Sequence, residues 1–77
     1  MFIVIETQTD ASGNSITVLE NNSIPTYASE EEALNKFYIV CSYAVTAHLP
    51  KHAVTVMTEE HQIVKSEIFK YPRTEGE

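Results

Sequence analysis

Basic and aromatic residues are interspersed near the end of the chain, and together they have the chemistry to hold a nucleotide. The basic ones are Lys65, Lys70 and Arg73, and the aromatic ones are Phe69 and Tyr71. Ammonium and guanidinium groups attract phosphate oxygens, and a cation beside an aromatic ring suits a stacked base. We therefore expect the three basic residues to bind the phosphates of a small nucleotide.

Tyrosines in the middle of the chain add aromatic surface for the same ligand. Tyr38 and Tyr43 are predicted to stack on the base, and Tyr27 is a third aromatic residue for a subunit boundary. The alternative interpretation is that the basic residues only keep an edge strand soluble, as they do in many natural sheets. Both interpretations stay open at this point.

The histidines are the candidates for a metal site. Imidazoles at His48, His52 and His61 and nearby carboxylates at Glu59 and Glu60 are ligand types that zinc accepts. The spacing of the first two suits one face of a helix, but a proline lies between them and breaks the helix that the pair would need. We therefore expect histidines in loops and at strand edges, exposed to water, and no metal site.

No combination of residues predicts an enzyme. Cys41, the one cysteine, lies on the apolar stripe of a predicted helix, where a buried thiol is inert. Two glycines cannot form a phosphate-binding loop, and no Ser/His/Asp set has a recognisable local context. The sequence predicts neither catalysis nor a cofactor.

An acidic run lies in the first turn of the same helix. Ser29 and Glu32 have the spacing of a capping box, and residues 30–32 place three carboxylates at the positive end of the helix dipole. Helix capping accounts for the run, and the alternative is an acidic patch that imitates a nucleic-acid backbone.

The spacing of apolar residues predicts an α+β fold with the order β-β-α-β-β. One helix would pack on one face of a four-stranded, mainly antiparallel sheet. The predicted strands cover residues 2–9, 15–20, 52–58 and 62–71, and the helix covers residues 29–48. The turn at 10–14 makes the first two strands a hairpin, and residues 72–77 form a polar, flexible tail.

The first strand is apolar on both of its sides. Ile3 and Ile5 alternate with Phe2 and Val4, and the third strand has a similar pattern. A sheet with one face in water alternates more cleanly between apolar and polar residues. We therefore predict a homo-oligomer, a dimer or larger, in which the second face is also covered.

Length and charge exclude several classes of protein. The 77 residues form a single domain, residues 1–77, with a formal charge of −6. Residues 1–35 contain six acidic residues and no Lys or Arg, and residues 36–77 contain five acidic and five basic residues. The chain therefore has no basic stripe that could bind a nucleic acid. Apolar runs are far shorter than the roughly 20 residues that span a bilayer, so no membrane is expected. Without a signal-peptide pattern or a disulfide, we expect the cytosol.

Several segments resemble short proteins encoded by phages and prophages of Gram-positive bacteria. They are residues 1–9, the helix start at Ser29, and residues 50–54, 58–61 and 64–67. The resemblance implies a viral protein in the cytosol of the host bacterium. Such short viral oligomers are similar in size to antagonists of bacterial immunity, which include sponges for cyclic or ADP-ribose-type nucleotides and inhibitors of CRISPR nucleases.

The leading hypothesis is a non-enzymatic antagonist of host antiviral defence that sequesters a small nucleotide signal between subunits. One alternative is a protein–protein inhibitor of a nuclease or other defence enzyme, which would use the acidic half of the chain. The other is a structural or assembly accessory of the phage.

Overall fold

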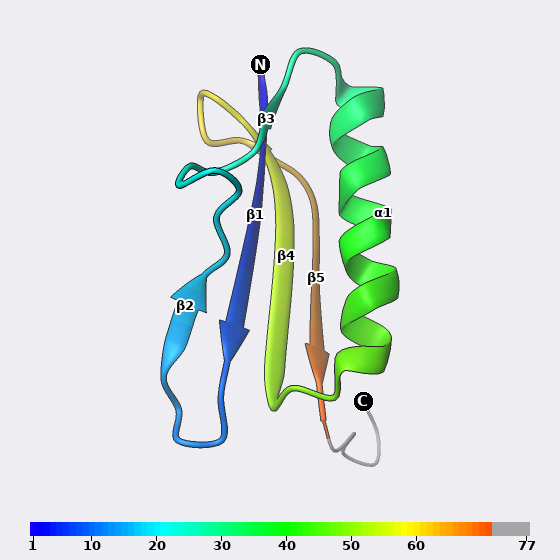
Figure 1. Ribbon diagram of the computed structural model, residues 1–77. Coiled ribbons are helices and arrows are strands. Elements are labelled where there is room, and N and C mark those ends of the chain that lie inside the picture. The colour runs from blue at the N-terminus through cyan, green and yellow to red at the C-terminus, as the bar shows by residue number, and fades with distance from the viewer. Residues whose placement is uncertain (72–77) are drawn as a thin grey trace.

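One helix packs against a curved antiparallel sheet (Figure 1). The computed structural model describes residues 1–71. Its elements are β1 (Phe2–Thr9), β2 (Ser15–Thr17), β3 (Thr26–Tyr27), α1 (Glu30–Ala47), β4 (Lys51–Thr58) and β5 (Ile63–Lys70). The predicted α+β class and the packing of one helix on one face are confirmed. The predicted tail, residues 72–77, lies outside the described residues.

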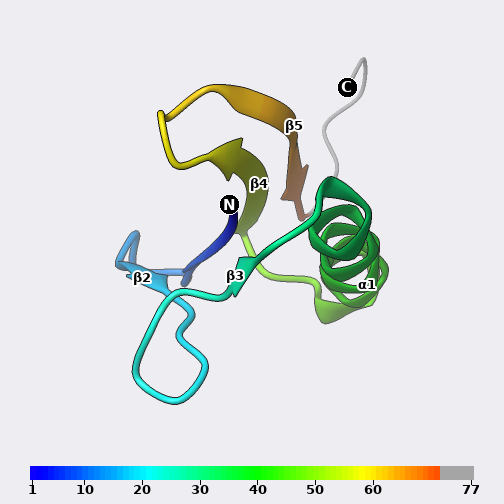
Figure 2. The same cartoon turned by 90° about the horizontal axis from the view of Figure 1, so that it is seen from above.

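The two long strands β1 and β4 form the centre of the sheet. The strand order is β2-β1-β4-β5, and all pairs are antiparallel. In the central pair Val4 lies opposite Val56, Glu6 opposite Val54 and Gln8 opposite His52. Seen from above, β1, β4 and β5 follow an arc, and α1 lies on its inner side (Figure 2).

Two short strands share the outer edge of β1, because β4 occupies the other edge. β2 pairs with residues 7–9 of β1, and β3 pairs with residues 2–3. Two backbone hydrogen bonds fill the gap between these strands. The Val18 N–H donates to the Glu6 carbonyl at 2.8 Å, and the Val4 N–H donates to the Pro25 carbonyl at 3.1 Å. The β1 edge is therefore paired along most of its length.

Local chemistry sets both ends of α1. The Ser29 hydroxyl accepts from the Glu32 backbone N–H at 3.2 Å, as the capping-box spacing predicts. The Glu32 carboxylate accepts from the Ser29 hydroxyl at 3.0 Å, where a full capping box would have it accept from the Ser29 backbone N–H. The helix ends at Ala47, because His48 adopts a left-handed conformation with φ 56° and Pro50 follows. No helix within residues 1–71 has the length and apolar character needed to cross a bilayer.

The core lies between α1 and the two central strands. Phe37, the largest buried apolar residue, comes from the middle of α1. Its buried apolar neighbours are Ala33 and Val40 from α1, Val4 from β1, and Val54 and Val56 from β4. The spacing of three and four along α1 and of two along the strands puts all of them on facing surfaces.

The segment between β2 and α1 differs from the prediction. The predicted strand at 15–20 ends at Thr17, and the strand β3 was not predicted. The reason is a tight turn at Asn21 and Asn22, whose positive φ values of 52° and 63° reverse the chain between Glu20 and Ser23. The chain then returns to the start of β1, where β3 pairs with Phe2 and Ile3. This pairing joins residues far apart in the sequence, so local patterns do not predict it.

The sheet face turned away from α1 carries apolar side chains that nothing in residues 1–71 covers fully. Ile3 and Ile5 of β1 are half-buried, and Ile68 of β5 is 53% exposed. The two-sided apolar pattern of the strands is therefore present in the fold. The oligomer that it predicts remains a prediction.

Phe37→Ala should lower the free energy of unfolding by roughly 3–5 kcal/mol, because it removes the one large side chain at the centre of the core. Total stabilities of small domains start near about 5 kcal/mol, so the variant should be largely unfolded. Urea titration followed by far-UV circular dichroism measures the change. Ser42→Ala, at an exposed position of the same helix, is the control and should shift stability by less than about 0.5 kcal/mol. Equal stabilities of the two variants would contradict this description of the core.

Candidate functional site

Two hollows flank α1, one on each side. The α1–β5 hollow has a volume of about 220 Å³ and is lined by Ala44, Val45, His48, Leu49, Phe69, Lys70 and Tyr71. The α1–β1 hollow has a volume of about 340 Å³ and is lined by Glu6, Gln8, Val18, Lys36, Ile39, Val40 and Tyr43. Their chemistry differs, because one is aromatic and the other is rich in ionisable groups.

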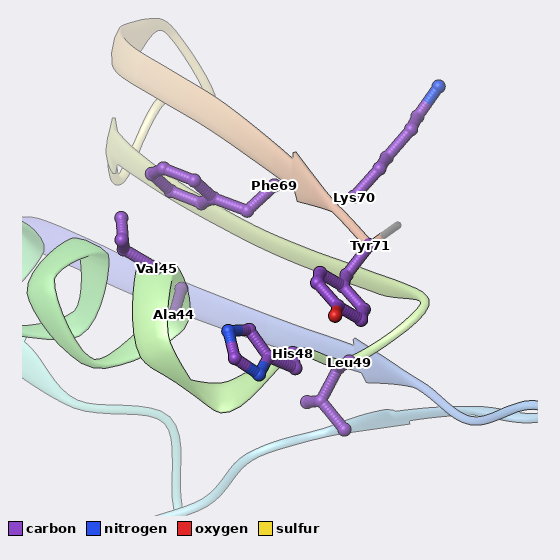
Figure 3. Close-up of a pocket in the computed structure, with 7 residues that line it drawn as sticks. All are labelled: Ala44, Val45, His48, Leu49, Phe69, Lys70 and Tyr71. Carbon is purple, nitrogen blue, oxygen red and sulfur yellow. The ribbon is translucent and has the colours of Figure 1, made fainter. Parts of the chain in front are cut away.

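An aromatic stack forms one wall of the α1–β5 hollow. The rings of His48 and Tyr71 are nearly parallel, with centroids 4.3 Å apart and an angle of 20° between their planes (Figure 3). The left-handed conformation of His48 turns the chain at the end of α1. Tyr71 follows β5, and its backbone N–H donates to the Pro50 carbonyl at 3.4 Å. The end of the helix and the end of the strand thus each supply one ring.

The rest of the α1–β5 hollow is apolar, with one cation at its rim. Phe69 is half-buried and packs against the core, and Val45 lies across from it on α1. The Lys70 side chain extends away from the two stacked rings (Figure 3). It is exposed and forms no ion pair within residues 1–71. The hollow is therefore mainly an aromatic and apolar surface, and the Lys70 ammonium points away from it.

A nearly enclosed hydrogen bond between a histidine and a carboxylate lies beside the α1–β1 hollow. His52 Nε2 is 2.6 Å from Glu6 Oε2, and the Gln8 amide donates to the same oxygen at 3.1 Å. His52 is only 1% exposed, and its ring meets the Tyr43 ring edge-on at 6.4 Å. A carboxylate only accepts, so Nε2 carries the proton of this bond. The other ring nitrogen, Nδ1, is buried without a partner in the described residues.

Lys36 is the cation of the α1–β1 hollow, and it is already paired. Its ammonium forms a hydrogen-bonded ion pair with Glu20, and this bond raises the pKa of Lys36 above its ordinary value. Glu6 and Glu20 both lie close by, so the acids outnumber the base. This hollow is poorly suited to an anionic ligand.

The burial of His52 differs from the prediction, which expected all three histidines to be exposed. His48 and His61 are exposed, but His52 alternates with Val54 and Val56 on the face of β4 that α1 covers. Glu6 alternates with Val4 on β1 in the same way. In each strand an ionisable residue occupies a position that the two-residue alternation assigns to the buried, apolar face. This pattern in the sequence could have indicated the contact between Glu6 and His52.

The predicted ligand-binding residues do not converge in one subunit. Tyr38 and Tyr43 are five residues apart, which places them about 140° apart around a helix, so they flank α1 on opposite sides. Tyr43 lines the α1–β1 hollow and Lys70 lines the α1–β5 hollow. Lys65 lies near Cys41 at mid-helix. Arg73 lies outside the described residues, so the predicted set would need contributions from more than one subunit.

Cys41 packs at the margin of the core and is half-buried, less than the prediction expected. Burial raises the pKa of its thiol, Glu67 raises it further and Lys65 lowers it. The raised pKa favours the unreactive thiol form. Within residues 1–71 no three His, Cys, Asp or Glu side chains come together as a metal site.

Comparison with known protein families, curated proteins and solved structures finds no match to this chain. Its function is therefore inferred from its own residues.

Glu6→Ala should lower the free energy of unfolding by about 1–3 kcal/mol, because it leaves the buried His52 Nε2 donor without an acceptor. Glu6→Gln keeps an acceptor oxygen in the same place and should cost less. Chemical denaturation of both variants and of the original protein checks the order. A Glu6→Ala variant as stable as the original would show that this hydrogen bond adds nothing to the stability of the fold.

Alkylation of Cys41 by iodoacetamide should be slower in the folded protein than in urea at the same pH. The thiolate is the reacting form, and a raised pKa leaves less of it. The rate-against-pH curve of the folded protein should therefore lie at higher pH than that of the unfolded protein. A folded-state curve at equal or lower pH would contradict the burial described here.

Proposed function

We propose that this protein is a non-enzymatic binding protein that sequesters a small nucleotide in the α1–β5 hollow. In agreement with the resemblance to phage and prophage proteins, the nucleotide would be an immune signal of the host bacterium. By holding it, the protein would antagonise antiviral defence. Sequestration requires affinity alone and no chemical step.

The single observation that carries this proposal is the stack of His48 on Tyr71 at an open hollow. Both residues are exposed, so the flat face of a base can continue the stack. Stacking of a base on an aromatic side chain contributes about 1–3 kcal/mol. Lys70 lines the same hollow, and its exposed, flexible side chain would have to turn toward the rings to reach a phosphate oxygen.

The size of the hollow supports a site shared between subunits. Complete sites for small molecules usually enclose about 300–1,000 Å³. The α1–β5 hollow measures about 220 Å³, which is room for part of a nucleotide. A second subunit would have to cover the rest of the ligand, in keeping with the predicted oligomer.

The enclosure of His52 supports binding over catalysis. A general base must come within hydrogen-bond reach of the proton that it removes. His52 is enclosed by β4, Glu6 and α1 and is 1% exposed, so a ligand in either hollow does not reach its ring. The pair is better explained as part of the fold.

Calorimetric titration with cyclic dinucleotides, ADP-ribose and its cyclic forms tests the proposal. At least one member of the panel should bind, and Tyr71→Ala should weaken binding roughly 5- to 150-fold through loss of stacking. Tyr43→Ala, which removes a tyrosine from the α1–β1 hollow, is the matched control and should bind as the original does.

Two results would count against the proposal. If a folded protein gives no heat with any member of the panel, nucleotide sequestration is wrong. If Tyr43→Ala abolishes binding and Tyr71→Ala does not, the ligand occupies the α1–β1 hollow instead.

A further inference from the structure

The outer edge of β5 is the longest unpaired strand edge of the described molecule. β5 is the last strand of the sheet order and pairs only with β4 within residues 1–71. Every residue of the strand except Phe69 is exposed. An open edge of eight residues presents free backbone N–H and C=O groups to any other strand. β1, by contrast, has both of its edges paired.

Two opposite charges lie on this edge with a spacing of two residues. Lys65 lies opposite Val56 and Glu67 lies opposite Val54, so both are on the side of the sheet that faces α1. Neither forms an ion pair within the described residues. Their positions at the edge, free of partners in residues 1–71, leave both available to a neighbouring strand.

Among the pairings of two copies of β5 that are centred on Lys65, Ser66 or Glu67, the charge pattern favours one. When identical antiparallel strands pair about a two-fold axis, the axis passes midway between one residue and the same residue of the other strand. An axis at Lys65 would set two lysines opposite each other, and an axis at Glu67 would set two glutamates opposite each other. An axis at Ser66 sets Lys65 opposite Glu67 twice. Like charges directly opposite destabilise a sheet, and unlike charges stabilise it.

We propose that the protein forms a homodimer in which β5 pairs antiparallel with β5 of a second copy, with the two-fold axis at Ser66. The sheet then continues through both subunits, with the two helices on the same side. This interface does not depend on whether the protein binds a nucleotide.

Apolar residues on either side of the charges agree with the same register. It places Val64, where the regular ladder begins to break, opposite Ile68. In the single chain Val64 is 36% exposed and Ile68 is 53% exposed. The β4–β5 ladder is irregular next to Val64, so the regular part of the edge runs from Lys65 to Lys70. Pairing would cover apolar surface that the isolated chain leaves in water.

Lys65 would also disfavour pairing of this edge with strands of other proteins. A charged residue at a sheet edge usually protects against pairing with unrelated strands. Here a carboxylate two residues away makes the edge complementary to itself. Repulsion of other partners and attraction of its own copy together give specificity.

Charge reversal tests the register by sedimentation velocity at low ionic strength. Lys65→Glu places glutamate opposite glutamate twice, and Glu67→Lys places lysine opposite lysine twice. Each single variant should dimerise at least about tenfold more weakly than the original protein. An equal mixture of the two variants should recover the original affinity as a heterodimer, because every pair is then again of opposite sign.

The double variant Lys65→Glu/Glu67→Lys is the second arm, since it exchanges the charges within one chain. It should dimerise as the original protein does, and circular dichroism should show native secondary structure. A monomeric original protein, single variants that dimerise unchanged, or a mixture and double variant that stay monomeric would each overturn the proposal. If a single variant does not fold, the double variant decides the outcome.

Discussion

The packing of α1 on β1 and β4 is the constraint on which the remainder of the structure depends. Six of the seven buried apolar residues in the described chain are alanine or valine, and only Phe37 is large. Small side chains let the helix lie close to the sheet, and the one phenylalanine fills the centre. The chain has a single cysteine and therefore no internal disulfide, so this thin layer must hold the fold without a covalent cross-link. Everything placed around it, including both hollows, takes its position from this contact.

The same packing explains why the two sides of α1 differ chemically. Toward β1, the helix covers Glu6 and His52, which continue the buried faces of β1 and β4. The hydrogen bond between them is therefore nearly enclosed. Toward β5, α1 makes few contacts, and the ends of helix and strand meet through aromatic rings instead. The edge of β1 is occupied by two short strands, whereas β5 has an open outer edge within residues 1–71. The α1–β5 hollow and the unpaired strand edge therefore both lie on the β5 side of the described molecule.

Local features could be predicted from the sequence, and contacts between distant segments could not. The helix start follows from Ser29 and Glu32, and the three long strands follow from runs of β-branched residues. Glu6 and His52 are 46 residues apart, and only the register of β1 against β4 brings them together. The strand β3 has two residues, too few for a sequence pattern. The separation of Tyr38 from Tyr43, however, follows from helix periodicity alone, and the predicted ligand set did not take it into account.

The left-handed backbone of His48 has a consequence for the stability of this chain. Glycine is the usual residue in that conformation at a helix end, since a side chain there costs about 1–2 kcal/mol. In a small domain this is a substantial fraction of the total stability. The imidazole recovers part of the cost by stacking on Tyr71, which ties the end of the helix to the end of the sheet. His48→Gly would therefore relieve the backbone and remove the stack at the same time, so the two effects oppose each other at this corner of the molecule.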